Sequence, residues 1–334
     1  MPDSVNTLDI ITQFLFYLVV YSIPLLYGTC GEITIEKSGS LNLGVEGTMA
    51  IGAIFGYLAG CATDNLFAGV IVAFVTAALT GAVFALFTVT FQANQNVTGL
   101  TITTFGVALY YFMGNALGEK WPVFVNSKKL VGSLESINIP GLSKIPVIGK
   151  AFFSHNILVY LGILMAVLLW VYFEKTRQGM RVRAIGENPG AADSLGIKVN
   201  LNKYLHIMLG SGIMGIGGLY MGFNMSGTFE GSNCWINGYG WIAIALVIFA
   251  NWNPAKAILG TFVFGFFKTL AVYYGTLAGS FPNALGWLGK IPSHFFAALP
   301  FIITLVILIA DSVRKNKHSN EPAAIGINYY REDR

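Results

Sequence analysis

Asn42 and Glu46 are the residues of this chain whose type and spacing point most directly to polar chemistry. They lie four positions apart in GEITIEKSGSLNLGVEG, residues 31–47, which leads into an apolar run. That spacing puts both on one face of a helix, near or within a membrane. An ionisable group at that depth is costly unless it faces a cavity or a partner. We expect either a broken helix beside the path of a polar solute, or packing in which both side chains hydrogen-bond to neighbouring helices.

A second polar stretch, formed by Asn94, Gln95 and Asn96, joins two apolar runs. We expect a cytosolic turn there, with Asn96 or Thr98 capping the following helix. Contact with a solute is the alternative role for these three residues.

Gly238 and Gly240 open a later helix, in the sequence GYGW. The first N–H groups of a helix have no intrahelical partner, so we expect them either to face a solute or to serve packing. Lys268 stands inside another apolar run, where it is expected to pair with a carboxylate such as Glu46 or to contact a solute. We interpret His206, near the start of a further run, as a polar filler at the cytosolic edge.

The composition requires a lipid environment. Of 334 residues, 54% are hydrophobic and 11% are charged, against about 25% charged in an ordinary soluble domain. Such a chain cannot cover a surface that faces water, so the bilayer must be its solvent. Small residues let membrane helices approach closely, and we expect such packing along Gly210–Tyr220 (GSGIMGIGGLY). The net charge of +4 indicates orientation rather than nucleic-acid binding, and the three cysteines lack the spacing of a metal site or disulfide framework.

Nine apolar runs are candidates for crossing a bilayer core, which needs about 20 helical residues. They span residues 9–28, 41–61, 66–91, 97–117, 155–173, 204–222, 239–251, 256–276 and 295–312. We predict an all-α, polytopic membrane bundle of about nine transmembrane helices, with about eight and ten as the bounds because one run is short and another is polar. The first run lacks the basic flank of a cleavable signal, so we expect it to be retained.

Lysines and arginines in the loops set the expected orientation. The 174–203 loop and the basic tail, residues 313–334, carry clusters of these cations and are expected in the cytosol. Because successive runs cross the membrane in alternate directions, we expect residues 223–238, residues 118–152 and the N-terminus to lie outside. We expect Glu32–Ser40 and Asn251–Lys256 to lie inside.

The strongest single signal is a hydrophilic segment at residues 177–197, RQGMRVRAIGENPGAADSLGI. Asn188 suits the N-cap of a helix, Pro189 its first position and Gly196 its end. The small apolar face of that helix consists of Ala191, Ala192 and Leu195. We predict a helix of one or two turns along the membrane surface that docks onto a cytosolic partner; a generic surface helix is the alternative.

Four segments resemble the permease subunits of bacterial ABC importers for simple sugars and nucleosides, most closely the nucleoside branch that works with a lipoprotein-like binding protein. Glu36–Ala53 (EKSGSLNLGVEGTMAIGA) resembles the glycine-rich motif of that branch, and Ala93–Phe105 (ANQNVTGLTITTF) resembles its ANQ-V-TGL segment. Arg181–Ile197 (RVRAIGENPGAADSLGI) resembles the segment that docks into the ATPase. Gly238–Pro254 (GYGWIAIALVIFANWNP) resembles a later helix and its closing turn. The order and spacing of the four segments extend the resemblance over nearly the whole chain.

The resemblance implies a transmembrane permease domain at residues 1–312 in the bacterial cytoplasmic membrane, without catalytic residues, metal or cofactor of its own. ATP and Mg²⁺ would bind to separate cytosolic ATPase subunits, and this chain has no Walker-type glycine loop. The other implied partners are a second permease, identical or related, and an extracytoplasmic binding protein. The residues implied in ATPase coupling are Arg181, Arg183, Gly186, Glu187, Asn188, Pro189, Ala192 and Gly196. The candidates for the substrate path are Asn42, Glu46, Asn94, Gln95, Asn96, Gly238 and Gly240.

Two other classes compete with this interpretation. An ion-coupled secondary transporter would need intramembrane carboxylates or a sodium site; Glu46 and Lys268 are its few candidates, and the docking segment would go unexplained. For a membrane enzyme we find no paired carboxylates, no HExxH zinc pattern and no GxSxG elbow. Among importers, a nucleoside leads as the solute, with a simple sugar such as ribose and branched-chain amino acids as alternatives.

Overall fold

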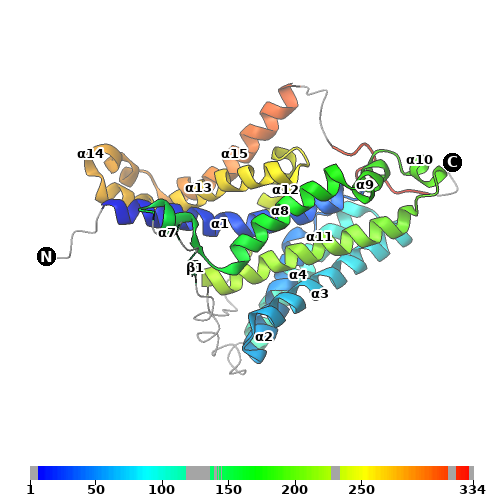
Figure 1. Ribbon diagram of the computed structural model, residues 1–334, viewed down its shortest axis with the longest axis horizontal. Helices are drawn as coiled ribbons and strands as arrows, with labels where there is room; N and C mark the ends of the chain where they lie inside the picture. Colours follow the sequence, from blue (N-terminus) through cyan, green and yellow to red (C-terminus); the bar gives the residue numbers. More distant parts are fainter. Residues whose placement is uncertain are drawn as a thin grey trace.

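A computed structural model describes residues 7–117, 136–138, 141, 143, 145–226, 234–314 and 321–330. Much of the predicted 118–152 loop lies outside these described residues, as does part of the basic tail. The described chain is built almost wholly of helices (Figure 1). This confirms the predicted class, an all-α polytopic bundle.

Each of the nine apolar runs lies on a helix. These helices are α1 (Thr7–Glu36), α2 (Val45–Thr63), α3 (Leu66–Ala85), α4 (Gln95–Leu117), α8 (Ile157–Lys175), α11 (Val199–Met221), α12 (Tyr239–Phe249), α13 (Pro254–Ser280) and α15 (Ser293–Arg314). Among the described residues, 7 helical spans are long and apolar enough to cross a membrane. The apolar parts of α12 and α15 are shorter.

Short elements connect the long helices. They are the π-helical turns η1 (Leu86–Thr90) and η3 (Gly222–Ser226), the helices α7 (Ile148–Phe152), α9 (Arg177–Glu187), α10 (Pro189–Ser194) and α14 (Pro282–Leu285), the 3₁₀ helix η4 (Gly286–Lys290), and the strands β1 (Ile137–Asn138) and β2 (Ser154–His155). The two strands pair antiparallel, with Ile137 opposite His155.

The centre of the bundle is formed by α1, α2, α3 and α11, which pack closely through glycine. A Cβ atom at Gly52 of α2 would lie 2.3 Å from the Cα of Gly215 on α11, and one at Gly210 would lie 2.4 Å from the carbonyl oxygen of Gly31 on α1. Any side chain at these positions would push the helices apart. The close packing predicted for Gly210–Tyr220 is therefore confirmed, and it acts within the subunit.

Segments predicted in the cytosol gather at one end of the molecule, where α9, α10 and the C-terminal residues lie together (Figure 1). The backbone N–H of Leu41 donates to the Gln95 side chain at 2.7 Å, which joins the α1–α2 connection to the start of α4. At the opposite end of α8, Asn156 donates to Asn224 at 2.7 Å, joining α8 to the end of α11. This arrangement agrees with the predicted alternation of these segments.

Helix α12 is about half as long as a membrane crossing. Its 11 residues extend about 16 Å at 1.5 Å per residue, against a bilayer core of about 30 Å. Trp235, which precedes it, is buried, and its ring centroid lies 5.0 Å from that of Tyr57 and 5.5 Å from that of Tyr110. Trp235 and Ile236 thus lie within the bundle, although they belong to the segment that the sequence places in an outer loop. Non-helical backbone is tolerated at this depth because protein covers it.

Candidate functional site

Glu46 binds the buried start of α12. Its carboxylate accepts hydrogen bonds from the backbone N–H groups of Gly238, at 2.6 Å, and Gly240, at 2.8 Å. These N–H groups have no partner within their own helix, and the helix dipole favours negative charge beside them. A Cβ at Gly240 would lie 2.4 Å from the backbone nitrogen of Glu46, so only glycine permits this approach. Three residues that the sequence offered as separate solute contacts thus form one interaction within the subunit.

Asn42 lies in the break between α1 and α2, so the prediction that it shares a helical face with Glu46 is wrong. Gly39 in this break has a left-handed backbone, with φ of 80°. The Asn42 side chain accepts a hydrogen bond from the N–H of Gly44 at 2.8 Å, an Asx turn that competes with helix formation. The N–H of Asn42 donates to Glu32 at 3.1 Å. The predicted break is present, and it begins before Asn42.

Two buried carboxyl groups, missed in the sequence, lie at the end of α1. Glu32 and Glu36 are 0% and 3% exposed, and the second carboxylate oxygen of Glu32 has no hydrogen-bond partner among the described residues. The indole N–H of Trp252, in the turn between α12 and α13, donates to Glu36. In the described chain, no lysine or arginine nitrogen lies within 4.0 Å of either carboxyl group. Their spacing of four residues, which puts both on one helical face, was the available signal.

The polar stretch 94–96 forms the predicted turn before α4, but Asn94 is its cap. The Asn94 side chain accepts from the N–H of Val97 at 3.1 Å. Neither Asn96 nor Thr98 does so, because α4 begins earlier than either cap would place it, at Gln95. The Gln95 side chain is buried and is engaged with Leu41. Of the three polar residues, two therefore have clear structural roles.

The hydrophilic segment 177–197 contains two helices, α9 and α10, where the sequence predicted one. Asn188 ends α9 and caps α10 by accepting from the N–H of Ala191 at 2.9 Å, and Pro189 is the first residue of α10, as expected. Gly196, with φ of 79°, follows the end of α10. The residues of the predicted apolar face differ in burial. Ala192 is buried with Ile185 and Val199, whereas Leu195 is 81% exposed.

Helix α9 rests on the end of α1. A Cβ at Gly186 would lie 2.5 Å from the carbonyl oxygen of Lys37, so the two backbones touch there. Arg183 forms an ion pair with Glu174 at 3.4 Å, and Arg181 donates to Gln178 at 3.5 Å. Burial, together with the Arg183 charge, lowers the pKa of Lys37. Glu187 is exposed at the end of α9. The charged residues of this helix are therefore divided between contacts within the subunit and an open surface.

Lys268 and His206 have local partners. The Nζ atom of Lys268 lies 5.3 Å from the centroid of the Tyr239 ring, a cation–π distance. No described carboxylate lies within 4.0 Å of it, so the expected pair with Glu46 is not formed. His206 bonds to the Tyr172 hydroxyl at 2.9 Å and to the Asn202 carbonyl at 2.7 Å, which fits a polar filler. In the described chain, no group of three His, Cys, Asp or Glu side chains is placed to hold a metal ion.

Residues 13–309 match the family model for the branched-chain amino acid transport system / permease component. The chain belongs to this permease family. It is 34% identical over 334 residues to the nucleoside ABC transporter permease protein NupC of Lactococcus lactis, covering 98% of each chain. It is 31% identical to the guanosine ABC transporter permease protein NupQ of Bacillus subtilis, covering 99% of this chain and 100% of that one.

A further relative is the putative glucose ABC transporter permease protein TsgC13 of Haloferax volcanii, 28% identical over 92% of this chain and 94% of that one. No solved structure gives a significant match. Family membership and the 7 spans confirm a multi-pass permease of the bacterial cytoplasmic membrane. Because members of this family are transport components, the prediction that the chain is not an enzyme is confirmed as well.

Proposed function

We propose that this permease forms the translocation path of an ATP-binding-cassette importer whose solute is a nucleoside. The observation that carries the proposal is similarity along the whole chain to a nucleoside permease and a guanosine permease. The similarity to the glucose permease is lower and covers less of the chain. A sugar is therefore the second candidate.

The surface of α10 is the proposed docking site for the ATPase subunits. Asn188 and Pro189 define a short rigid helix, Ala192 anchors it to the subunit, and Leu195 projects away from it. The 81% exposed Leu195 side chain is accessible to a protein partner at this end of the molecule. ATP and Mg²⁺ would bind in that partner, and α9 would transmit its movement to the end of α1 through Gly186.

We propose the exposed face of α4 as the substrate path. Glu46, Gly238 and Gly240 are bonded to one another, whereas α4 exposes Thr101, Thr104 and Asn115 along the bundle surface. The two threonine hydroxyls donate to carbonyl oxygens of their own helix, whereas the Asn115 amide is unfavourable against lipid. A second permease subunit, identical or related, would cover this face and leave a polar passage between the two copies. An extracytoplasmic binding protein would deliver the solute to that passage.

Uptake in cells with and without the gene tests this function. We expect uptake of radiolabelled guanosine to be lost on deletion and restored by the intact gene. Unlabelled adenosine should compete, whereas ribose, glucose and leucine should not. Loss of glucose, ribose or leucine uptake with normal guanosine uptake would show that the solute is not a nucleoside, while the proposed importer function would stand.

A matched pair of variants tests the ATPase-docking step. Leu195→Glu changes an 81% exposed side chain, so the permease should fold but lose ATPase co-purification and uptake. Leu195→Met should retain both. The permease alone in proteoliposomes should not accumulate nucleoside against a gradient. Accumulation driven by an ion gradient would instead make it a secondary transporter.

A further inference from the structure

The C-terminal residues 321–330, called the strap below, return to the end of the molecule that carries α9 and α10 (Figure 1). On this side, the N–H of Ala324 donates to the carbonyl oxygen of Gly186 in α9 at 2.8 Å. The hydroxyl of Tyr329 donates to the carboxylate of Asp193 in α10 at 2.8 Å. The strap therefore contacts both helices of the proposed docking surface.

The strap also contacts the turn that leads into α4. The Gln92 side chain donates to the carbonyl oxygen of Tyr329 at 2.9 Å. The Asn328 amide donates to the carbonyl oxygens of Gln92, at 2.5 Å, and Ala93, at 3.3 Å, and accepts from Gln95 at 3.0 Å. Four hydrogen bonds thus join two adjacent strap residues to the start of the helix whose exposed face is the proposed path.

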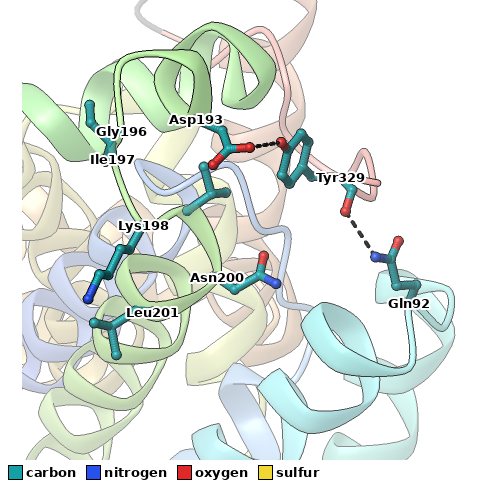
Figure 2. A pocket seen from close by; sticks show the side chains of 9 residues that line it. Gln92, Asp193, Gly196, Ile197, Lys198, Asn200, Leu201 and Tyr329 are labelled. Carbon is teal, nitrogen blue, oxygen red and sulfur yellow. Dashed lines mark hydrogen bonds between the residues drawn. The ribbon is translucent and has the colours of Figure 1, made fainter. Parts of the chain in front are cut away.

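Figure 2 shows Tyr329 between these two attachments. A pocket of about 460 Å³ is lined by the α10–α11 corner, by Gln92 and by Tyr329. The Tyr329 side chain reaches Asp193 on one side of the pocket, and its backbone carbonyl receives Gln92 on the other. One strap residue thus links α10 to the α4 turn by hydrogen bonds on both sides of a hollow.

The strap is held by apolar contact as well as by hydrogen bonds: Pro322 and Ala324 are buried, and the Tyr329 ring packs against the buried cluster of Ile185, Ala192 and Val199. Ile327 is 59% exposed and Tyr330 is 50% exposed, so neither apolar side chain is buried in the bundle. Hydrogen bonds fix direction and distance more tightly than apolar contact does. A polar link of this kind passes a displacement from one attached element to the other as long as its bonds hold.

We propose that Tyr329 and Asn328 are positioning residues that transmit movement of α10 to α4, so that the strap couples ATP hydrolysis to solute translocation. This inference rests on the proposed function, because it requires an ATPase beneath α10. It adds to that function a second mechanical connection, separate from the contact of α9 with α1.

The test uses the complete transporter, with ATPase, partner permease and binding protein, reconstituted in proteoliposomes. Guanosine transported per ATP hydrolysed is measured for Tyr329→Phe and Asn328→Asp. The first removes the hydroxyl that binds Asp193; the second turns an acceptor toward two carbonyl oxygens. We expect the ratio to fall about fivefold to tenfold in each, the factor expected for the loss of one ordinary intramolecular hydrogen bond, while ATP hydrolysis and subunit assembly persist.

Matched variants separate coupling from general stability. Tyr330→Phe makes the same chemical change one residue along, at a hydroxyl without a hydrogen bond among the described residues, and should leave the ratio unchanged. Asp193→Asn keeps an oxygen that can accept from Tyr329 and should retain most of the ratio. A wild-type ratio in both Tyr329→Phe and Asn328→Asp, an equal fall in Tyr330→Phe, or loss of ATPase from the complex would overturn the proposal. Absence of ATP-driven uptake by the wild-type complex would instead refute the proposed function.

Discussion

Replacing Glu46 with glutamine should destabilise the subunit far more than the same change at its surface. The Glu46 carboxylate accepts from two backbone N–H groups, at 2.6 Å and 2.8 Å, and is 6% exposed. Glutamine keeps one oxygen as an acceptor but turns its NH₂ group toward the other N–H. Two donors then face each other where water cannot replace the lost bond.

The expected magnitude follows from those two bonds. A hydrogen bond to a charged group contributes roughly 1.5–3 kcal/mol. Because Glu46→Gln removes one bond and takes the charge from the other, we expect the free energy of unfolding to fall by about 2–4 kcal/mol. Glu174→Gln is the matched control. Its carboxylate lies 3.4 Å from Arg183, both side chains are more than a third exposed, and such pairs contribute less than about 1 kcal/mol.

The free energy of unfolding of both variants is measured on the purified chain in mixed detergent micelles. The fraction of denaturing detergent is increased, and tryptophan fluorescence reports unfolding. Trp235, Trp241 and Trp252 lie before, in and after α12, so the signal includes the region around Glu46. If Glu46→Gln unfolds within about 0.5 kcal/mol of Glu174→Gln, the range of ordinary surface changes, the argument that Glu46 stabilises the start of α12 fails.

Two further predictions concern packing and pH. Gly240→Ala should lower the free energy of unfolding by about 1–3 kcal/mol, because its Cβ would meet the Glu46 backbone at 2.4 Å. Gly275→Ala is the control; it has open space around it and should be neutral or stabilising. An equal loss of unfolding free energy in both variants would contradict the reasoning. Burial lowers the pKa of His155 from its ordinary value of 6.5, so the folded state binds fewer protons than the unfolded state between the lowered pKa and that value. The free energy of unfolding should fall as pH drops through this window. The midpoint of thermal unfolding is measured from pH 7.5 to 5, a range set about the ordinary histidine pKa. This midpoint should depend less on pH in His155→Gln than in the wild type.

The helices could be predicted because their signals are local. An apolar run of membrane length determines a helix wherever it occurs, and all nine predicted runs lie on one. Asn188 and Pro189 fix the start of α10 through the N-cap bond and the fixed φ of proline. The same local rules missed α9 because they gave one helix to the whole segment. They also misjudged Asn42, whose Asx turn lies before the start of α2 at Val45.

The pairings could not be predicted because each joins residues distant in sequence. Glu46 meets Gly238, 192 positions away, and Glu36 meets Trp252, 216 positions away. Spacing rules give the face on which a side chain lies but not the helix that will cover it. The strap is a stronger case. Its polar residues follow a lysine-bearing segment and suggest a solvated tail, yet Asn328 bonds to Gln92 from 236 positions away.

The burial of the helices separates two kinds of bundle surface. In the most apolar windows of α2 and α11, 72% and 78% of residues are buried, so these helices form the interior. The corresponding windows of α3 and α4 are each only 28% buried, yet α3 is much the more apolar of the two. Lipid is an adequate cover for α3, whereas the exposed Asn115 amide of α4 calls for water or protein beside it. Helix α4 is as exposed as α3 but more polar. We therefore place the proposed partner permease and solute path on the α4 side of the subunit.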